Sequence, residues 1–134
     1  MSVTKFFKIF SGCQSAHGQT KVLDSARNGK MNAQSFIVRA PLTEELVKEH
    51  FKGTQGVGSI PIDESNKCVF GALDIDDYNL DLIALKNKID RLKLPLVVCR
   101  SKSGGAHCFL FVKEKISAAE MRDKLAEFAS ALGF

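Results

Sequence analysis

The clearest pattern of hydrophobic and polar positions lies in the second half of the chain. Residues 68–75 form an almost continuous apolar run, which is typical of a strand buried on both faces of a sheet. Apolar residues then recur at three- and four-residue spacing, namely Leu82, Leu85, Ile89 and Leu92. This spacing predicts an amphipathic helix over 80–93, capped by Asn79.

Two further strands and a last helix follow. Residues 96–100 and 106–112 are predicted strands, and the Gly-rich turn SKSGG between them makes a hairpin the simplest prediction. Ser117 and Glu120 have the spacing of a capping box for a final helix, which Gly133 would close. The core-facing residues of that helix would be Met121, Leu125, Phe128 and Leu132. The order strand, helix, strand, strand, helix matches a ferredoxin-like or RRM-like unit whose final strand is absent.

The first half of the chain has a weaker pattern. Thr43 caps a predicted helix that Gly53 would close. The other expectations are a strand or helical turn over 5–10, a loop over 25–33, a strand over 35–39, that helix over 44–51, and a strand over 57–62. The fold class expected for the whole chain is therefore α+β, an RRM-like core with an N-terminal α/β extension.

The composition is that of one small domain. With 134 residues, 45% hydrophobic and 25% charged, the chain can bury one modest core. We predict a single domain over 1–134, made of an α/β portion over 1–56 and an incomplete RRM-like core over 57–134. Of the four cysteines, Cys68, Cys99 and Cys108 lie in apolar runs, where a reduced thiol acts as a small hydrophobe. The sequence also shows neither a signal peptide nor an apolar segment of membrane length. Together with the reduced cysteines, these features predict a cytoplasmic location.

The net charge of +4 is unevenly distributed. Residues 1–56 carry eight Lys or Arg against four Asp or Glu, whereas residues 57–134 carry eleven of each. The surplus of basic residues in 1–56 is compatible with a polyanionic partner but does not require one, because an ordinary solvated basic surface has the same excess of Lys and Arg.

Three aspartates follow the first strong strand, in the sequence GALDIDDYN. Because strand side chains alternate, Asp74 and Asp76 share one face while Ile75 enters the core. Carboxylates on one face repel unless a cation lies between them, and Mg²⁺ or Mn²⁺ takes such oxygen ligands. The alternative is a polar strand end before a helix, and Asp77 is interpreted as structural in this way.

The hairpin adds candidate phosphate ligands. They are Arg100, Lys102, Ser103, Gly104, Gly105 and His107. Glycines let backbone N–H groups approach an anion, and Arg100 or Lys102 can neutralise a triphosphate. Taken alone, SGG is an ordinary turn and a single histidine is a satisfied polar residue. Beside the aspartates, however, the hairpin would supply the phosphate half of a site whose metal half is Asp74 and Asp76.

Two long segments carry a family resemblance. HFKGTQGVGSIPIDESNKCVFGALDID and LPLVVCRSKSGGAHCFLF resemble the archaeo-eukaryotic primase superfamily, the catalytic domain of primases and primase-polymerases. They are most similar to the primase domain of TOTE conflict systems and of related phage and mobile-element primases. The resemblance covers residues 50–133, with a weaker match at FSGCQSAHG, where His17 is either a nucleotide or template contact or a loop histidine.

The resemblance implies roles for individual residues. Asp74 and Asp76 match the first motif, which holds divalent metal, and His107 with Ser103 matches the second, which contacts the phosphates of the incoming nucleotide. The third motif, an acidic metal ligand on a strand after the last helix, has no position in this sequence. The chain would then be a fragment or a naturally shortened relative.

Two functions follow as hypotheses. The first is template-directed nucleotidyl transfer, which would use Mg²⁺ or Mn²⁺, nucleoside triphosphates and a single-stranded DNA template or primer, with a helicase or other replication partner. The second is a shortened module that binds nucleotide or single-stranded nucleic acid without turnover. Because the closing strand is absent, we also expect weak catalysis and homo-oligomerisation through the open sheet.

Overall fold

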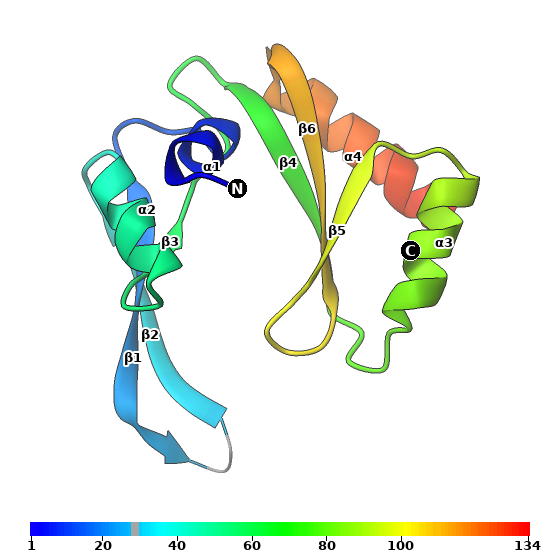
Figure 1. The fold of residues 1–134 in the computed structure, drawn as a ribbon. Coiled ribbons are helices and arrows are strands. Elements are labelled where there is room, and N and C mark those ends of the chain that lie inside the picture. The colour runs from blue at the N-terminus through cyan, green and yellow to red at the C-terminus, as the bar shows by residue number, and fades with distance from the viewer. Residues whose placement is uncertain (28–29) are drawn as a thin grey trace. The chain divides into compact units, whose positions relative to one another are not determined.

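The computed structural model describes residues 1–27 and 30–134, and the side chains of 23–32 are outside the description. Within the described residues the fold is α+β, with four helices and two small antiparallel sheets (Figure 1). The chain divides into two compact units, Met1–Asn66 and Lys67–Phe134.

The first unit contains the sheet β2-β1-β3 and two helices. The strands are β1 (His17–Arg27), β2 (Lys30–Val38) and β3 (Gly56–Gly58), and the helices are α1 (Val3–Ile9) and α2 (Glu44–Phe51). The Phe6 ring of α1 lies 4.7 Å from the Phe10 ring and 5.1 Å from the Phe51 ring of α2. As predicted, the Thr43 side chain caps α2 by accepting from the Leu46 N–H.

In this unit the structure resolves one open alternative and corrects two sequence predictions. The ambiguous segment 5–10 lies largely in α1, and the loop predicted over 25–33 is largely replaced by β1 and β2, with 28–29 outside the described residues. Val22 and Ile37 of this hairpin are 58% and 61% exposed. Because these apolar side chains are exposed, the paired strands lack the regular alternation of apolar and polar residues by which a strand is identified from sequence. The strand predicted over 57–62 ends at Gly58, because the Ile60 carbonyl accepts from the Cys13 N–H and Pro61 has no N–H to donate.

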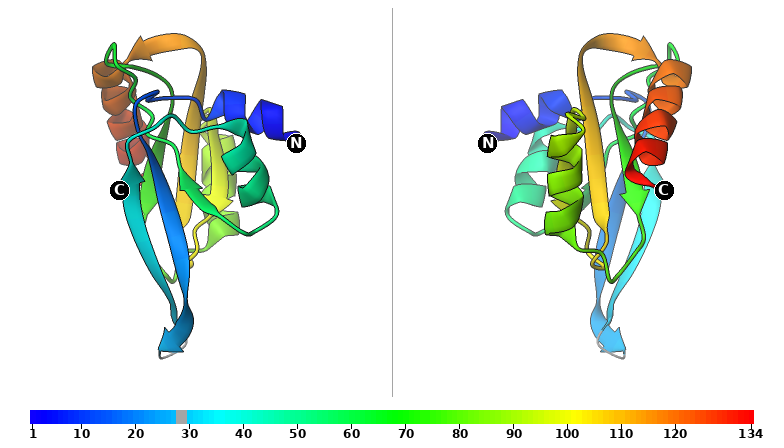
Figure 2. Two further views of the ribbon diagram at one scale, coloured as in Figure 1. Left: turned by 90° about the vertical axis from the view of Figure 1, so that its left-hand side faces the viewer. Right: turned by 90° about the vertical axis from the view of Figure 1, so that its right-hand side faces the viewer.

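The second unit follows the element order predicted from the sequence. Its elements are β4 (Lys67–Ile75), α3 (Leu82–Arg91), β5 (Leu96–Arg100), β6 (Ala106–Ser117) and α4 (Ala118–Leu132). The sheet order is β4-β6-β5, and both neighbouring pairs are antiparallel. The helices α3 and α4 cover the same face of this sheet (Figures 1 and 2).

The core of the second unit lies between this sheet and its two helices. Its buried residues are Cys68, Ile75, Leu85, Ile89, Leu96, Ala106, Cys108, Leu110, Met121, Leu125 and Leu132. The predicted capping box of Ser117 and Glu120 begins α4, and Gly133 ends it at φ 92°. The Lys88 Nζ of α3 donates to the Leu132 carbonyl at 2.8 Å, which joins the ends of the two helices. The cap of α3 is Asp81 rather than the predicted Asn79.

Gly71 sets how closely α4 approaches β4. A Cβ at this position would lie 2.7 Å from Met121 Cγ and 2.8 Å from Leu125 Cδ1. We expect Gly71→Ala to lower the free energy of unfolding by about 1–3 kcal/mol, because both side chains must move in a packed core. Urea unfolding would measure the change, with Gly18→Ala as the control, since its Cβ would meet nothing closer than 3.5 Å. Equal stability of the two variants would contradict the close packing.

The cysteines separate into buried and exposed thiols. Cys68 and Cys108 are buried as predicted, and burial raises the pKa of the Cys108 thiol. Cys99 is exposed, contrary to the prediction, because the alternation of β5 places it on the face that α3 and α4 do not cover. Within the described residues the four cysteines form no disulfide bond.

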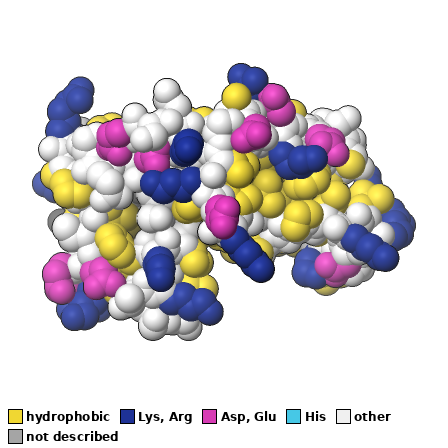
Figure 3. Space-filling view, turned by 90° about the horizontal axis from the view of Figure 1, so that it is seen from above, with side chains coloured by type: hydrophobic (Ala, Val, Ile, Leu, Met, Phe, Trp, Pro, Cys, Tyr) yellow, Lys and Arg dark blue, Asp and Glu magenta, His cyan; other side chains and the backbone are white. Residues whose placement is uncertain are grey.

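The surface is mixed in charge. Figure 3 shows Lys and Arg side chains interspersed with Asp, Glu and hydrophobic side chains. No helix of the described chain has the length and apolar character needed to cross a membrane.

Candidate functional site

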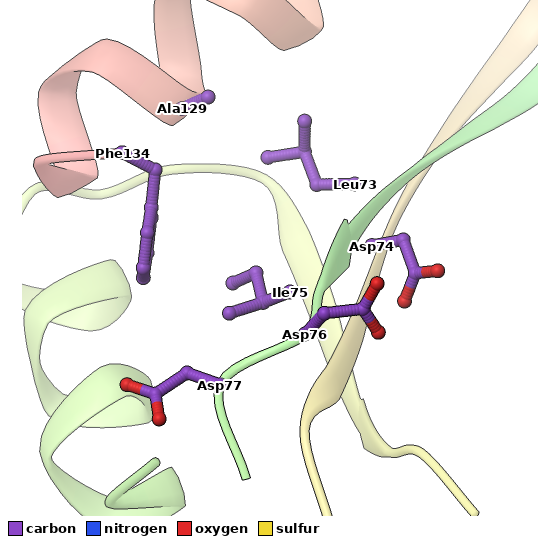
Figure 4. Close-up of a pocket in the computed structure, with 7 residues that line it drawn as sticks. All are labelled: Leu73, Asp74, Ile75, Asp76, Asp77, Ala129 and Phe134. Carbon is purple, nitrogen blue, oxygen red and sulfur yellow. The ribbon is translucent and has the colours of Figure 1, made fainter. Parts of the chain in front are cut away.

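Asp74 and Asp76 lie at the end of β4 and point to the same side. Asp74 is within the strand and Asp76 follows its last residue, Ile75. Figure 4 shows both carboxylates on one side of the strand, while Leu73 and Ile75 point toward the α4 side. The Asp74 side chain is 60% exposed, so a ligand in solution can reach it. The predicted shared face of the two carboxylates is therefore present.

Asp77 points the opposite way and holds a turn. In Figure 4 its carboxylate faces away from those of Asp74 and Asp76. Its Oδ1 accepts from the Asn79 N–H at 3.0 Å, and its carbonyl accepts from the Leu80 N–H at 3.2 Å. These bonds give Asp77 the structural role predicted from the sequence.

His107 lies beside Asp74 across the sheet. The strand register places Asp74 opposite His107, and His107 opposite Cys99 on the other neighbouring strand. His107 Nδ1 lies 3.2 Å from Asp74 Oδ1, and 42% of the imidazole side chain is exposed. Asp74 thus orients a histidine that remains open to solvent.

The turn between β5 and β6 is closed by backbone hydrogen bonds. The Ser101 N–H donates to the Gly105 carbonyl at 2.9 Å, and the Gly104 N–H donates to the Ser101 carbonyl at 3.2 Å. Gly104 has φ 100°, a conformation that side chains disfavour, which explains a glycine here. Lys102 and Ser103 are exposed at the tip.

Gly105 brings this turn against the end of β4. A Cβ on Gly105 would lie 2.0 Å from the Ile75 carbonyl oxygen, so the two backbones are in direct contact. Ile75 is flanked by Asp74 and Asp76 in the sequence. The structure therefore brings the predicted phosphate turn next to the predicted metal-binding carboxylates.

Arg100 does not join this group. It lines a pocket of about 330 Å³ on the α3 side of the sheet together with Leu82, Ile83, Lys86, Asn87 and Val98. Alternation along β5 explains the placement, because Arg100 shares its side with Val98 and not with Cys99.

A second pocket runs along the edge of β4. Its volume is about 310 Å³, and its lining consists of Leu73, Asp74, Ile75, Asp76, Asp77, Ala129 and Phe134 (Figure 4). Side chains of consecutive strand residues point to opposite faces of the sheet. A pocket lined by five consecutive residues therefore lies along the edge of the strand rather than on one face. Over the described chain β4 pairs only with β6, which leaves this edge open. The association predicted through an open sheet would occur here.

The side chains at this site supply some of the oxygen ligands that a divalent cation such as Mg²⁺ requires. The described chain contains no preformed group of three or more His, Cys, Asp or Glu side chains suited to a metal. Two carboxylates on one side of β4 nevertheless match Mg²⁺, which keeps several waters and is often completed by substrate phosphates. The residues present are thus consistent with a cation delivered together with a triphosphate.

His17 has a different environment from the one predicted. It begins β1 and is 2% exposed, rather than lying in a loop. Its Nδ1 lies 2.7 Å from the Ala40 carbonyl oxygen, and its Nε2 lies 3.0 Å from Gln19 Nε2. Both ring nitrogens therefore have partners inside the first unit.

Two residues near the candidate site were not found from the sequence. Cys99 lies opposite His107, and Ser101 is buried at the start of the turn. Two features could have identified both residues. Strand alternation places Val97, Cys99 and Ser101 on one face of β5 and its continuation, and the Ser101 N–H bonds to the Gly105 carbonyl across the turn.

A family model described as the TOTE conflict system, Archaeo-Eukaryotic Primase domain, matches residues 9–131. No curated protein matches the chain.

Proposed function

The chain belongs to the archaeo-eukaryotic primase domains of TOTE conflict systems, and on this premise we propose that it is a metal-dependent nucleotidyltransferase domain. Its substrates would be nucleoside triphosphates, with single-stranded DNA as template or primer. Asp74 and Asp76 would hold Mg²⁺ or Mn²⁺, and the turn at 101–105 with His107 would bind the triphosphate.

The observation that carries the proposal is the contact between Asp74 and His107. A carboxylate from the metal half and an imidazole from the phosphate half meet at 3.2 Å. The backbone contact of Gly105 with Ile75 fixes the turn beside them. Residues 33 positions apart in sequence are thus adjacent at one end of the sheet, as a shared ligand would require.

Each side chain has a distinct task in this proposal. Lys102 would neutralise phosphate charge, and the Ser103 hydroxyl would donate to a phosphate oxygen. With Nδ1 held by Asp74, the His107 Nε2 is left for the triphosphate. When bound, the divalent cation would screen the triphosphate and activate the attacking 3′-hydroxyl.

Titration of dATP and ATP in the presence of Mn²⁺, followed by primer extension on the same sample, tests the function. We expect measurable binding and weak extension, because two carboxylates can seat one cation, whereas in-line transfer is best served by two cations roughly 3.5–4 Å apart. Binding with no extension at all would favour the binding module over the enzyme. No Mn²⁺-dependent binding of either nucleotide would overturn the proposal.

His107→Ala tests the phosphate half of the site. If His107 donates one charge-assisted hydrogen bond to phosphate, the change should weaken triphosphate binding by about 1.5–3 kcal/mol. Calorimetric titration with dATP and Mn²⁺ would measure the loss. His50→Ala, an exposed histidine of α2, is the matched control and should bind normally. An unchanged dissociation constant for His107→Ala would leave the hairpin as a structural turn only.

A further inference from the structure

A groove on the helix side of the second sheet is separate from the proposed nucleotide site. It is the pocket that contains Arg100, whereas Asp74 and His107 lie on the face that α3 and α4 do not cover. Ile83 of its wall is 76% exposed, so the groove is open along its length rather than enclosed. Its lining contains no acidic residue and consists of Leu82, Ile83, Lys86 and Asn87 from α3 with Val98 and Arg100 from β5. Such a lining favours a partner that brings apolar surface and negative charge.

The strand that forms one wall of this groove is an edge strand. In the described chain, the sheet order β4-β6-β5 gives β5 a neighbouring strand on one side only. Sheet edges are usually protected by charged side chains, proline or a β-bulge. The first four residues of β5 include neither a charge nor a proline, and the register with β6 runs without a bulge from Leu96 to Arg100. Val97 is 52% exposed on the other face. The outer edge of β5 is therefore suited to pairing with a further strand.

Side-chain alternation defines what such a strand would place in the groove. Val98 and Arg100 both face α3, and an added strand would present its own alternate side chains on that same side. One of these would lie over Val98 and Ile83, where an apolar side chain fits. The next, two positions away, would lie beside Arg100. Lys86 already pairs with Asp90, whereas Arg100 has no ion pair within the described residues. A carboxylate is thus the complement of the groove at Arg100.

From this arrangement we propose that the groove binds an extended acidic peptide segment of a partner protein, which adds to the edge of β5 as a further strand. The segment carries an apolar residue and an Asp or Glu two positions apart. Backbone hydrogen bonds to β5 supply affinity, and the groove beside Val98 and Arg100 supplies specificity. Single-stranded nucleic acid fits less well, because it has no alternating N–H and C=O groups to pair with a strand edge. The inference does not depend on the proposed nucleotidyltransferase function.

A synthetic peptide of the sequence Thr-Glu-Thr-Ile-Thr-Glu-Thr tests the groove, because it presents the pattern in either strand direction. Fluorescence anisotropy of the labelled peptide should show saturable binding to the full chain. Arg100→Glu should weaken binding at least about 10-fold, as expected for loss of one charge-assisted hydrogen bond. Ile83→Ser should also weaken it without lowering the melting temperature, since Ile83 is exposed. Arg122→Glu, at an exposed arginine of α4, is the matched control and should bind normally.

Two further measurements identify how the peptide binds. Hydrogen exchange should slow at backbone amides of 97–100 when the peptide is bound, and a peptide with methylated backbone nitrogens should not bind. Binding of the methylated peptide, equal affinity for a version with Lys in place of Glu, or normal binding by Arg100→Glu would overturn the inference. So would binding of oligo-dT that Arg100→Glu abolishes, if the peptide itself does not bind. Asp74→Asn should bind the peptide normally, so failure here leaves the proposed function standing, and loss of peptide binding in that variant would contradict a separate groove.

Discussion

Asp74→Asn and Asp76→Asn are each expected to abolish Mn²⁺-dependent nucleotide binding while leaving the fold intact. Both carboxylates point to one side of β4, and the described chain supplies no third ligand that could replace either of them. Loss of groups that merely support metal ligands costs about 10–100-fold in metal affinity, so loss of a ligand itself should cost at least about 100-fold. Asparagine preserves the size of the side chain, so the melting temperature should stay close to that of the wild type.

Asp77→Asn is the matched control for these two substitutions. Its carboxylate points away from the pair, and its bond from the Asn79 N–H can be kept by an amide oxygen. Titration of Mn²⁺ and dATP into the three variants should therefore give two losses and one normal isotherm. Normal metal-dependent binding by both Asp74→Asn and Asp76→Asn would remove the basis for the metal site.

The second unit could be predicted well because its elements carry strong local signals. The capping box of Ser117 and Glu120 satisfies backbone N–H groups within a few residues, so sequence alone identifies it. The predicted cap of α3 is wrong because the helix begins two residues later than predicted. The Asp77 side chain holds a turn before the helix by accepting from the Asn79 backbone N–H, and Asp81 accepts from the N–H groups of Ile83 and Ala84.

The first unit could not be predicted to the same extent. Its β1–β2 hairpin leaves Val22 and Ile37 exposed, and exposure of this kind removes the alternation by which strands are identified. The pairing of β1 with β3 joins residues far apart in sequence, such as Gln19 and Val57, through backbone bonds. No side-chain pattern specifies such a register.

The candidate site was predictable where it depends on a single strand. Alternation along β4 was sufficient to place Asp74 and Asp76 together. The position of Arg100 depends instead on which face of β5 the helices cover, and charge alone does not indicate that face. Ser101 was missed for a related reason, because a serine next to a glycine-rich turn is usually exposed, and its burial follows only from the contact of Gly105 with β4.

Gly105→Ala is expected to damage both the fold and the site. The new Cβ would lie 2.0 Å from the Ile75 carbonyl oxygen and 3.1 Å from its carbon. These are backbone atoms of a paired strand, so they cannot rotate away as the side chains facing Gly71 can. The start of β6 must move instead, and we expect the free energy of unfolding to fall by about 3 kcal/mol, the upper part of the usual range for overpacking.

The same movement should disrupt the triphosphate site. His107 is two residues from Gly105 and is held 3.2 Å from Asp74, so a shift at the start of β6 changes that distance directly. A misplacement of about 1 Å at a reacting site can cost on the order of 100-fold, and we expect a loss of that size in primer extension, with weakened dATP binding. Gly58→Ala is the control, because its Cβ would meet only Gly18 atoms at 3.6 Å or more. Wild-type stability and dATP affinity in Gly105→Ala would show that the turn does not depend on contact with Ile75, and that the two halves of the site are positioned by other means.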